Sequence, residues 1–167
     1  MKEIPDYQTL MLPVLESVAD GKEHKFREIA ASIAKDFGLT EEELGCLLPS
    51  GNQSIFDNRV GWAKTYLKKA CLIEYKGKGV LKITERGKQV LKDSPQKIDN
   101  KFLKQYDEFN EFQNKVNTKE EKQETETDYK NQTPEELIET AFHDFQKSLA
   151  EELLDKIRNV SPAFFEK

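Results

Sequence analysis

Residues 54–87, SIFDNRVGWAKTYLKKACLIEYKGKGVLKITERG, decide the fold. The first half predicts a helix over 54–70, because five apolar residues spaced 4, 3, 4 and 3 apart share one face: Phe56, Val60, Ala63, Leu67 and Ala70. Two short apolar runs follow at 72–75 and 80–83, and the Lys-Gly-Lys-Gly run between them is typical of a hairpin turn. The stretch therefore predicts a helix that runs directly into a two-stranded hairpin.

The charge of this stretch is opposite to that of the whole chain. Residues 52–88 carry nine cations and three anions, a net charge of +6, whereas the 167-residue chain carries −5. Residues 105–155 carry fifteen acids and only five bases. A basic helix and a basic hairpin can attract a phosphate backbone, which the acidic C-terminal half repels. We therefore expect an α+β fold, a winged helix-turn-helix with additional C-terminal helices, that binds double-stranded DNA.

The N-terminal third of the chain predicts three further helices. Apolar spacing places one at 6–20, with a kink at Pro13, and a second at 25–37. Thr40, followed three residues later by Glu43, predicts a capping box that opens a short third helix. The hydrophobic fraction of the whole chain is 37%. This is enough for one small core, formed by these helices and the basic stretch, but not for a core that spans the full length.

The C-terminal part predicts separate segments. Thr84 can cap a helix through Leu91, and an amphipathic helix over 99–114 packs back on the domain or onto a partner. Residues 115–132 are polar, acidic and nearly free of large apolar residues, which is typical of a linker. The predicted division is a winged helix DNA-binding domain at 1–95, a packing helix at 96–115, an acidic flexible linker at 116–132, and a further helical segment at 133–167.

The last helix has a distinct start and a broad apolar side. Thr133 is a capping residue, Pro134 suits the first helical position, and Glu135 and Glu136 suit the next two. The helix is expected to continue to about Asn159. An isolated helix with this much apolar surface needs a partner, so a homodimer through 133–159 is a candidate.

The candidate DNA-binding residues lie on the basic helix, just before it, and on the hairpin: Gln53, Ser54, Asn58, Arg59, Gly61, Trp62, Lys64, Thr65, Lys68, Lys69, Lys76 and Lys78. The lysines are expected to contact phosphates, and Asn58 and Thr65 to reach base edges. On a helical wheel the face opposite the core carries Ser54, Asn58, Gly61, Thr65 and Lys68, with Gly61 at its centre. A mid-helix glycine costs about 1 kcal/mol against alanine, and it becomes useful where DNA must approach the backbone.

Several of these residues also have ordinary structural interpretations. Trp62 suits packing at the edge of the domain better than base stacking. Arg59 suits an intradomain salt bridge, to Asp57 or to an acid of the second helix, as well as a phosphate contact. Gln53 suits a loop or cap role as well as phosphate binding. For Lys76 and Lys78 a DNA contact is favoured over the alternative, the solubilising tip of a hairpin.

The sequence gives no indication of an active site or of a metal site. Cys46 and Cys71 are not in a CxxC pattern, and His24 and His143 lack partners at motif spacing. We therefore expect no catalytic residue, no metal ligand and no cofactor in this chain. A signal peptide and a long apolar run are also missing from the sequence, so we expect a cytoplasmic protein without a membrane partner.

With these residues in view, the chain resembles the N-terminal part of Mrr-type (type IV) restriction system proteins. The run at 58–63, NRVGWA, is the most specific match. The other matching residues are Tyr7, Pro13, Val14, Leu15, Ser50, Gly51, Leu67, Ala70, Leu72, Ile73, Gly79, Ile83, Thr84 and Gly87. The likeness is good over residues 1–92 and looser over the last helix, where it includes residues 160–162, Phe165 and Glu166.

The resemblance implies a DNA-targeting module of an endonuclease that acts on foreign, modified DNA. In that family a segment like Ser161-Pro162 opens a nuclease domain with a PD-(D/E)xK active site. The catalytic residues of such a domain, and the Mg²⁺ they would use, lie beyond residue 167. The resemblance thus implies the targeting part of the enzyme without its cleaving part.

Two other function classes fit the same residues. A winged helix transcriptional regulator would use the same helix and hairpin, and a footprint at its own promoter would favour it. A protein-interaction module would bind a partner through the winged helix and the acidic segments. Equal behaviour with and without DNA would favour that alternative.

Overall fold

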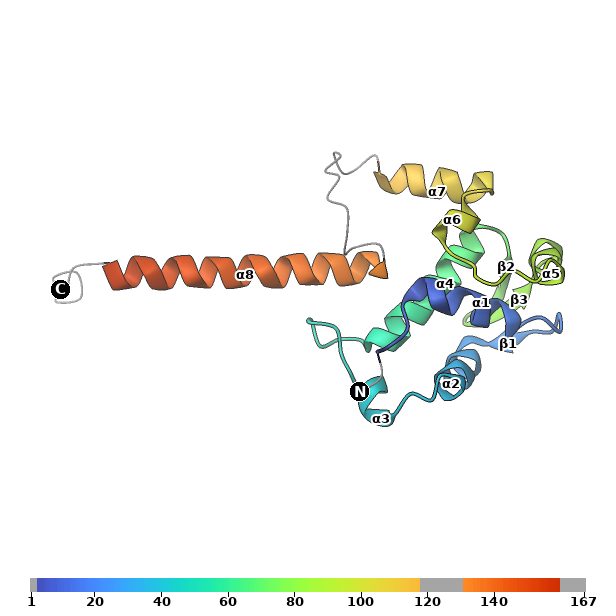
Figure 1. The fold of residues 1–167 in the computed structure, drawn as a ribbon, viewed down its shortest axis with the longest axis horizontal. Helices are drawn as coiled ribbons and strands as arrows, with labels where there is room; N and C mark the ends of the chain where they lie inside the picture. The colour runs from blue at the N-terminus through green and yellow to red at the C-terminus, as the bar shows by residue number, and fades with distance from the viewer. Residues whose placement is uncertain (1–2, 118–130, 160–167) are drawn as a thin grey trace.

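The computed structural model describes residues 3–117 and 131–159. Within these ranges the chain forms a helical domain with one small sheet, followed by a long helix (Figure 1). The elements, in chain order, are α1 (Tyr7–Glu16), β1 (His24–Lys25), α2 (Phe26–Asp36), α3 (Glu41–Leu44), α4 (Ile55–Lys69), β2 (Ile73–Gly77), β3 (Val80–Ile83), α5 (Glu85–Lys92), α6 (Asn100–Leu103), α7 (Asp107–Asn117) and α8 (Pro134–Asn159).

The sheet confirms the predicted winged helix. Its strands lie in the order β1-β3-β2 with antiparallel pairing, and β2 and β3 form the hairpin that follows α4. Gly79 has a φ of +74°, the left-handed conformation that the turn requires and that glycine adopts without strain. The sequence did not predict β1, because two residues are too few to show an alternating pattern.

The core lies where α1 packs on α4. Leu10, Met11 and Val14 of α1 are fully buried, as are Val60 and Leu67 of α4. The helix predicted over 54–70 is therefore confirmed, together with the apolar face that its spacing assigned to the core. Burying the face of α4 that carries residues 60 and 67 leaves the opposite face of the helix for other contacts.

The predicted helix starts are also confirmed. Thr40 and Glu43 form a reciprocal capping box at the start of α3, and the Thr84 hydroxyl accepts a hydrogen bond from the backbone N–H of Gly87 in α5. At the start of α8, the N–H of Glu136 donates to Thr133 Oγ1, and the N–H of Thr133 donates to the Glu136 carboxylate. The sequence predicts these caps because the donor and the acceptor of each hydrogen bond lie three residues apart.

The segment predicted as one helix over 99–114 is two helices, α6 and α7. Lys104 caps the C-terminus of α6, and α7 begins only at Asp107. Phe109 of α7 is fully buried against Tyr66 of α4, at a ring-centroid distance of 5.6 Å. This segment therefore packs back on the domain, which was one of the two predicted possibilities. The break brings the aromatic side of α7 onto α4.

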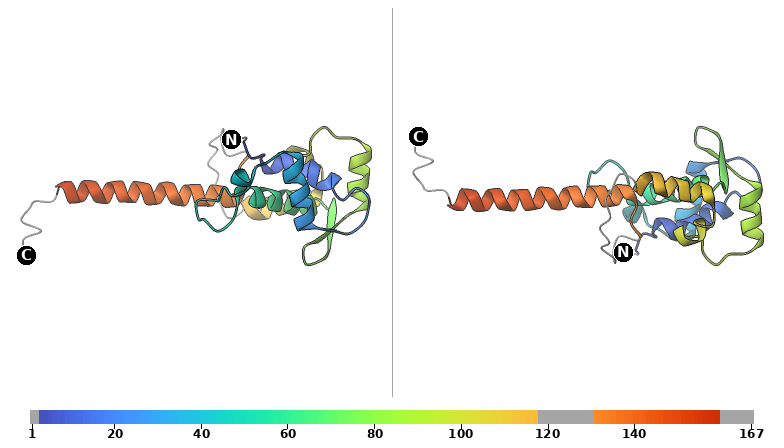
Figure 2. Two further views of the ribbon diagram at one scale, coloured as in Figure 1. Left: turned by 90° about the horizontal axis from the view of Figure 1, so that it is seen from below. Right: turned by 90° about the horizontal axis from the view of Figure 1, so that it is seen from above.

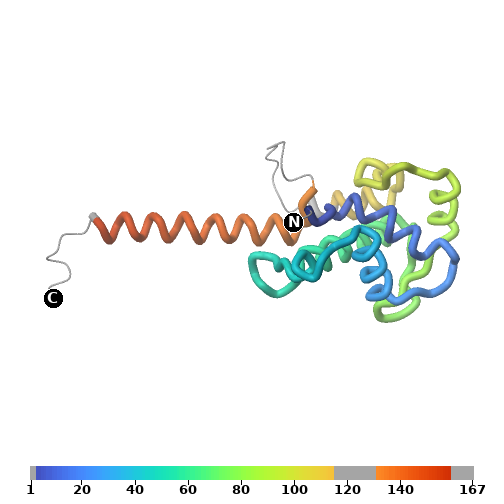
Figure 3. The backbone as a smooth tube through the Cα atoms, turned by 60° about the horizontal axis from the view of Figure 1, so that its bottom comes forward, coloured from blue at the N-terminus to red at the C-terminus, as the bar shows by residue number. Residues whose placement is uncertain are grey.

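Helix α8 begins against the domain and then projects away from it as one straight helix (Figures 2 and 3). Its apolar side chains beyond the first turn are exposed, with Phe142 at 60% and Phe145 at 64%. Most of the predicted linker, residues 118–130, lies outside the described residues, as does the 160–167 segment that carried part of the resemblance.

Candidate nucleic-acid interface

Helix α4 has the position that the recognition helix holds in a winged helix fold, and it meets the hairpin through lysine and aromatic side chains. Lys68 Nζ lies 3.8 Å from the ring centroid of Tyr75 on β2, and Lys64 Nζ lies 5.7 Å from the same centroid. Lys64 Nζ also lies 4.0 Å from the ring centroid of Phe26, at the start of α2. Cations over aromatic faces are held by the ring quadrupole. These contacts join α2, α4 and the hairpin into one cationic surface.

Burial shifts the pKa values of two side chains in this cluster. The pKa of Lys64 lies below its ordinary value because the side chain is half-buried and Lys68 is nearby. Burial raises the pKa of Tyr75, and a hydrogen bond with Thr65 opposes that rise. An ordinary lysine pKa is about 10.4, and a partly buried ammonium beside a second one gains from an anionic partner such as a phosphate.

Gly61 opens the centre of this surface. Beyond the adjacent residues and the backbone of its own helix, a Cβ atom built at Gly61 would meet no described atom within 4 Å. Two depressions meet at this residue, one of about 550 Å³ between α2 and α4, and one of about 250 Å³ that also includes Trp62 and Thr65. Packing within the described chain therefore does not require glycine here, although glycine weakens the helix.

Two of the remaining candidates on α4 contact aromatic rings. Lys69 is exposed, with Nζ 4.9 Å from the ring centroid of Phe112 in α7. Trp62 packs edge-on to Tyr66 at a centroid distance of 5.7 Å and lies partly buried against the core. Trp62 therefore packs at the edge of the core, as the packing interpretation predicted. It also borders the depression beside Gly61.

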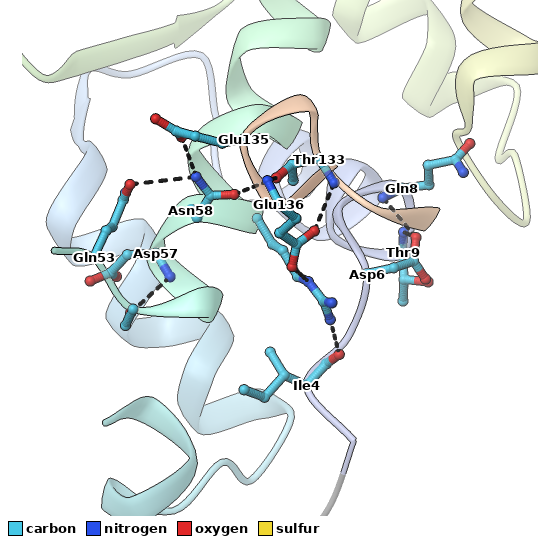
Figure 4. Close-up of polar contacts among 12 residues, drawn as sticks. Ile4, Asp6, Gln8, Thr9, Gln53, Asp57, Asn58, Thr133, Glu135 and Glu136 are labelled. Carbon is cyan, nitrogen blue, oxygen red and sulfur yellow. Dashed lines mark hydrogen bonds and ion pairs between the residues drawn. The ribbon is translucent and has the colours of Figure 1, made fainter. Parts of the chain in front are cut away.

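Asn58 does not lie on an exposed face, contrary to its position on the helical wheel. It is only 2% exposed, because the start of α8 covers it. Its Oδ1 accepts a hydrogen bond of 2.6 Å from the Thr133 hydroxyl, and its Nδ2 donates to Gln53 and to Glu135 (Figure 4). In this conformation Asn58 binds protein groups and is not free to reach a base edge.

Arg59 forms the salt bridge that was one of its two predicted roles. Its Nε donates to Glu136 Oε1 at 2.8 Å, and its Nη1 donates to the carbonyl oxygen of Ile4 at 2.6 Å (Figure 4). The acid comes from α8, whereas the sequence suggested Asp57 or an acid of the second helix. Arg59 thereby ties the chain before α1 and the start of α8 to the recognition helix.

The residues before α4 divide into a cap and an exposed side chain. Ser54 caps α4, since its hydroxyl accepts a hydrogen bond of 3.1 Å from the N–H of Asp57. Gln53 is exposed and borders both depressions at Gly61.

On the hairpin, Lys76 and Lys78 are both exposed, as predicted for its tip. Lys76 Nζ lies 2.9 Å from Glu74 Oε1, and that hydrogen bond raises the pKa of Lys76. Lys78 is not held in such a pair among the described contacts, so it presents its charge directly to solvent. The structure thus places six of the twelve candidates around one surface of α4 and the facing strand β2: Gln53, Gly61, Trp62, Lys64, Thr65 and Lys68.

Residues of α8 and Tyr75 were missed by reasoning from the sequence. The sequence indicated the capping box of Thr133 and Glu136 but not its contacts with α4, because the partners lie 75 to 77 residues apart. The local signal for Tyr75 was that it is an aromatic residue of a hairpin that directly follows a helix with three lysines.

The described residues contain no group of three or more His, Cys, Asp or Glu side chains that could hold a metal ion. His24 Nε2 lies 2.8 Å from Asp20 Oδ1 in an ordinary surface pair. Within the same described ranges, none of the helices is both long and apolar enough to cross a membrane.

Comparison with known proteins supports the resemblance. The Mrr N-terminal domain family matches residues 7–93. The chain is also 24% identical, over 176 aligned residues, to the type IV methyl-directed restriction enzyme EcoKMrr of Escherichia coli (strain K12). That alignment covers 98% of this chain and 56% of the relative, so the chain spans about half the relative's length. No solved structure matches this chain. Because the match over 7–93 includes α1, the recognition helix and the whole hairpin, this chain belongs to the Mrr N-terminal domain family.

Proposed function

We propose that this chain binds double-stranded DNA as the targeting module of a restriction system that acts on foreign, modified DNA in the cytoplasm. The observation that carries the proposal is the convergence of Lys64 and Lys68 on Tyr75. This convergence makes the recognition helix and the hairpin one cationic surface. A duplex laid on this surface would meet both elements at once, which is how winged helices divide contacts between groove and backbone.

The binding has two physical components. Lys64, Lys68, Lys69 and Lys78 supply sequence-independent affinity by displacing counterions from phosphates, so this part weakens with salt. The face around Gly61 and Thr65 supplies discrimination, because the missing side chain at Gly61 lets a base edge or a methyl group approach the helix backbone. The two depressions that meet at Gly61 make this face concave, so it can accept a protruding group of the duplex, which a flat surface of lysines cannot.

Cleavage is assigned to a different part of the system. The relative is named as a restriction enzyme, and this chain aligns with 56% of it. We assign cutting to a PD-(D/E)xK nuclease domain outside these 167 residues, together with the Mg²⁺ such a domain uses. The chain itself takes the role of locating DNA, and no step of that role requires a metal.

Helix α8 is proposed to pair with a second copy of the chain. Six of its seven large exposed apolar residues lie at positions 138, 142, 145, 149, 153 and 157, with spacings of 4, 3, 4, 4 and 4. This spacing keeps them on one continuous side of a helix that projects free of the domain, and self-pairing covers such a side on both copies at once (Figure 2). A dimer would present two recognition helices to one duplex.

Fluorescence anisotropy with methylated and unmethylated forms of one duplex, across a salt series, tests the proposal. We expect binding that weakens steeply with salt and favours the methylated duplex. Equal affinity for both forms would leave a general DNA-binding domain with specificity elsewhere. Failure to bind at low salt would overturn the proposal and favour the protein-interaction alternative, whereas preference for the chain's own promoter would favour the regulator.

A further inference from the structure

Residues 133–139, called here the docked segment, lie on the N-terminal half of the recognition helix. Thr133 Oγ1 donates to Asn58 Oδ1 at 2.6 Å, and Glu136 Oε1 lies 2.8 Å from Arg59 Nε. One turn further on, Glu139 accepts hydrogen bonds from the N–H and the hydroxyl of Ser50, at 2.9 and 2.8 Å. The segment therefore occupies polar groups of α4 and of the loop that leads into it.

Glu135 puts a negative charge on the candidate DNA surface itself. It accepts a hydrogen bond from Asn58 Nδ2 and borders the 250 Å³ depression that Gly61, Trp62 and Thr65 also border. A phosphate or base edge that enters this depression meets a carboxylate. Like charges at close range repel, and this repulsion falls directly on the surface that carries Lys64.

The groups that hold the docked segment have the chemistry that binds phosphate. A guanidinium, a side-chain amide and a loop N–H with its hydroxyl all donate hydrogen bonds to anions, and in this structure they donate to three carboxylates. The glutamates thus stand where phosphate oxygens of a bound duplex would find donors.

The attachment of the docked segment is polar. Among the described residues of this segment and α8, the buried side chains are Thr133 and Glu136, while the apolar residues further along α8 are exposed. An element held by a few polar contacts can separate locally without unfolding the core, because little apolar surface is lost.

We propose that the docked segment is an autoinhibitory element that competes with DNA for the N-terminal half of α4, so that DNA binding releases α8. This inference rests on the proposed DNA-binding function and adds its regulation. By linkage, whatever holds α8 in place weakens DNA binding, and DNA weakens the attachment of α8 by the same factor. Occupancy of the recognition helix is thereby transmitted to whatever α8 carries.

The test compares charge removal inside and outside the docked segment. The variant Glu135→Gln/Glu139→Gln removes two charges there, and the control Glu151→Gln/Asp155→Asn removes two from the exposed distal part of α8. In anisotropy titrations at one fixed salt concentration, we expect the first variant to bind a duplex about five- to tenfold more tightly than the parent, and the control less than about twofold. Equal gains in both would show simple long-range repulsion and overturn the inference.

A charge-neutral variant separates attachment from charge. Thr133→Val removes the hydrogen bond to Asn58 without changing net charge, and we expect it also to tighten DNA binding. Unchanged affinity here, despite intact folding by circular dichroism, would contradict competition by the docked segment.

Amide hydrogen exchange follows the segment directly. With saturating duplex we expect faster exchange at Thr133, Glu136 and Leu137, because the cap that bonds their N–H groups opens more readily once Thr133 and Glu136 lose their contacts with Asn58 and Arg59. Slower exchange at these amides would mean that DNA binds with the segment in place, which overturns the inference and leaves the proposed function standing. If neither the parent nor Glu135→Gln/Glu139→Gln binds DNA at low salt, both the inference and the proposed function fail.

Discussion

Arg59 Nε on the recognition helix lies 2.8 Å from Glu136 Oε1 on α8, and the two residues are 77 positions apart in the chain. Their side chains are only 18% and 8% exposed, so the pair is largely removed from water. Removing one partner of a buried pair typically costs about 3–5 kcal/mol when the other stays buried. Here Glu136 belongs to an element that can separate, so the cost is limited to the free energy of docking.

Glu136→Gln should therefore loosen the start of α8 while the domain remains stable. We expect the main thermal transition to change by no more than about 0.5 kcal/mol, as for a surface substitution, because the α1–α4 core is untouched. Limited proteolysis with mass spectrometry should show faster cleavage within residues 131–139. Glu151→Gln serves as the matched control, and a large loss of thermal stability without faster cleavage would show that α8 is part of the core.

A side chain added at Gly61 should preserve or raise the stability of the fold but weaken DNA binding. Gly61→Ala adds a methyl group that, beyond the adjacent residues and the backbone of its own helix, meets no described atom within 4 Å, so we expect it to stabilise the fold by up to about 1 kcal/mol through helix propensity. Gly61→Leu should fold equally well but bind a duplex at least about tenfold more weakly, a difference of about 1.4 kcal/mol. Chemical denaturation and anisotropy on the same samples measure both, and a loss of stability with unchanged binding would place Gly61 away from DNA.

The pairing of Arg86 with Glu108 predicts a dependence on pH. The guanidinium donates to both carboxylate oxygens at 3.0 and 2.9 Å, which lowers the pKa of Glu108 below its ordinary value. A carboxyl whose pKa is lowered by folding contributes stability above its unfolded pKa, about 4.3 for glutamate, and loses it as the pH falls through the folded pKa. The melting temperature of Glu108→Gln should lie slightly below that of the parent at pH 7. That gap should close in acid, and a gap that widens as pH falls would be inconsistent with this pair.

Self-association through α8 should depend on its apolar side. The parent, one chain of 19.3 kDa, should sediment with a mass that rises toward a dimer with concentration. Phe142→Glu/Phe145→Glu should remain a monomer over the same range, because two carboxylates would be buried in the pairing surface. Analytical ultracentrifugation distinguishes the cases, and a parent that stays monomeric throughout would rule out pairing of copies through α8.

The parts of the fold that the sequence predicted are those encoded locally. The apolar spacing of α4, the glycine turn of the hairpin and the caps at Thr40, Thr84 and Thr133 all involve residues within a few positions of one another. The break between α6 and α7 was missed because the aromatic spacing continues across it.

The candidate surface could be predicted only in part. A helical wheel places each residue relative to its own core, so it put Lys68, Gly61 and Asn58 on one outer face. It cannot see that a segment 75 residues further along the chain covers Asn58. For the same reason the partner of Arg59 was sought nearby and was found on α8. Contacts between distant segments depend on tertiary packing, which local spacing does not encode.

The salt dependence of duplex binding by Lys64→Ala/Lys68→Ala/Lys69→Ala tests the DNA-binding surface most directly. Each phosphate contact that is lost should reduce the slope of log K against log salt by about 0.9, so the slope should flatten by about 2 to 3 relative to the parent. The control Lys147→Ala/Lys156→Ala/Arg158→Ala removes equal charge from distal α8 and should leave the slope nearly unchanged. A correctly folded variant with the parent's slope would show that DNA does not bind to this face of α4.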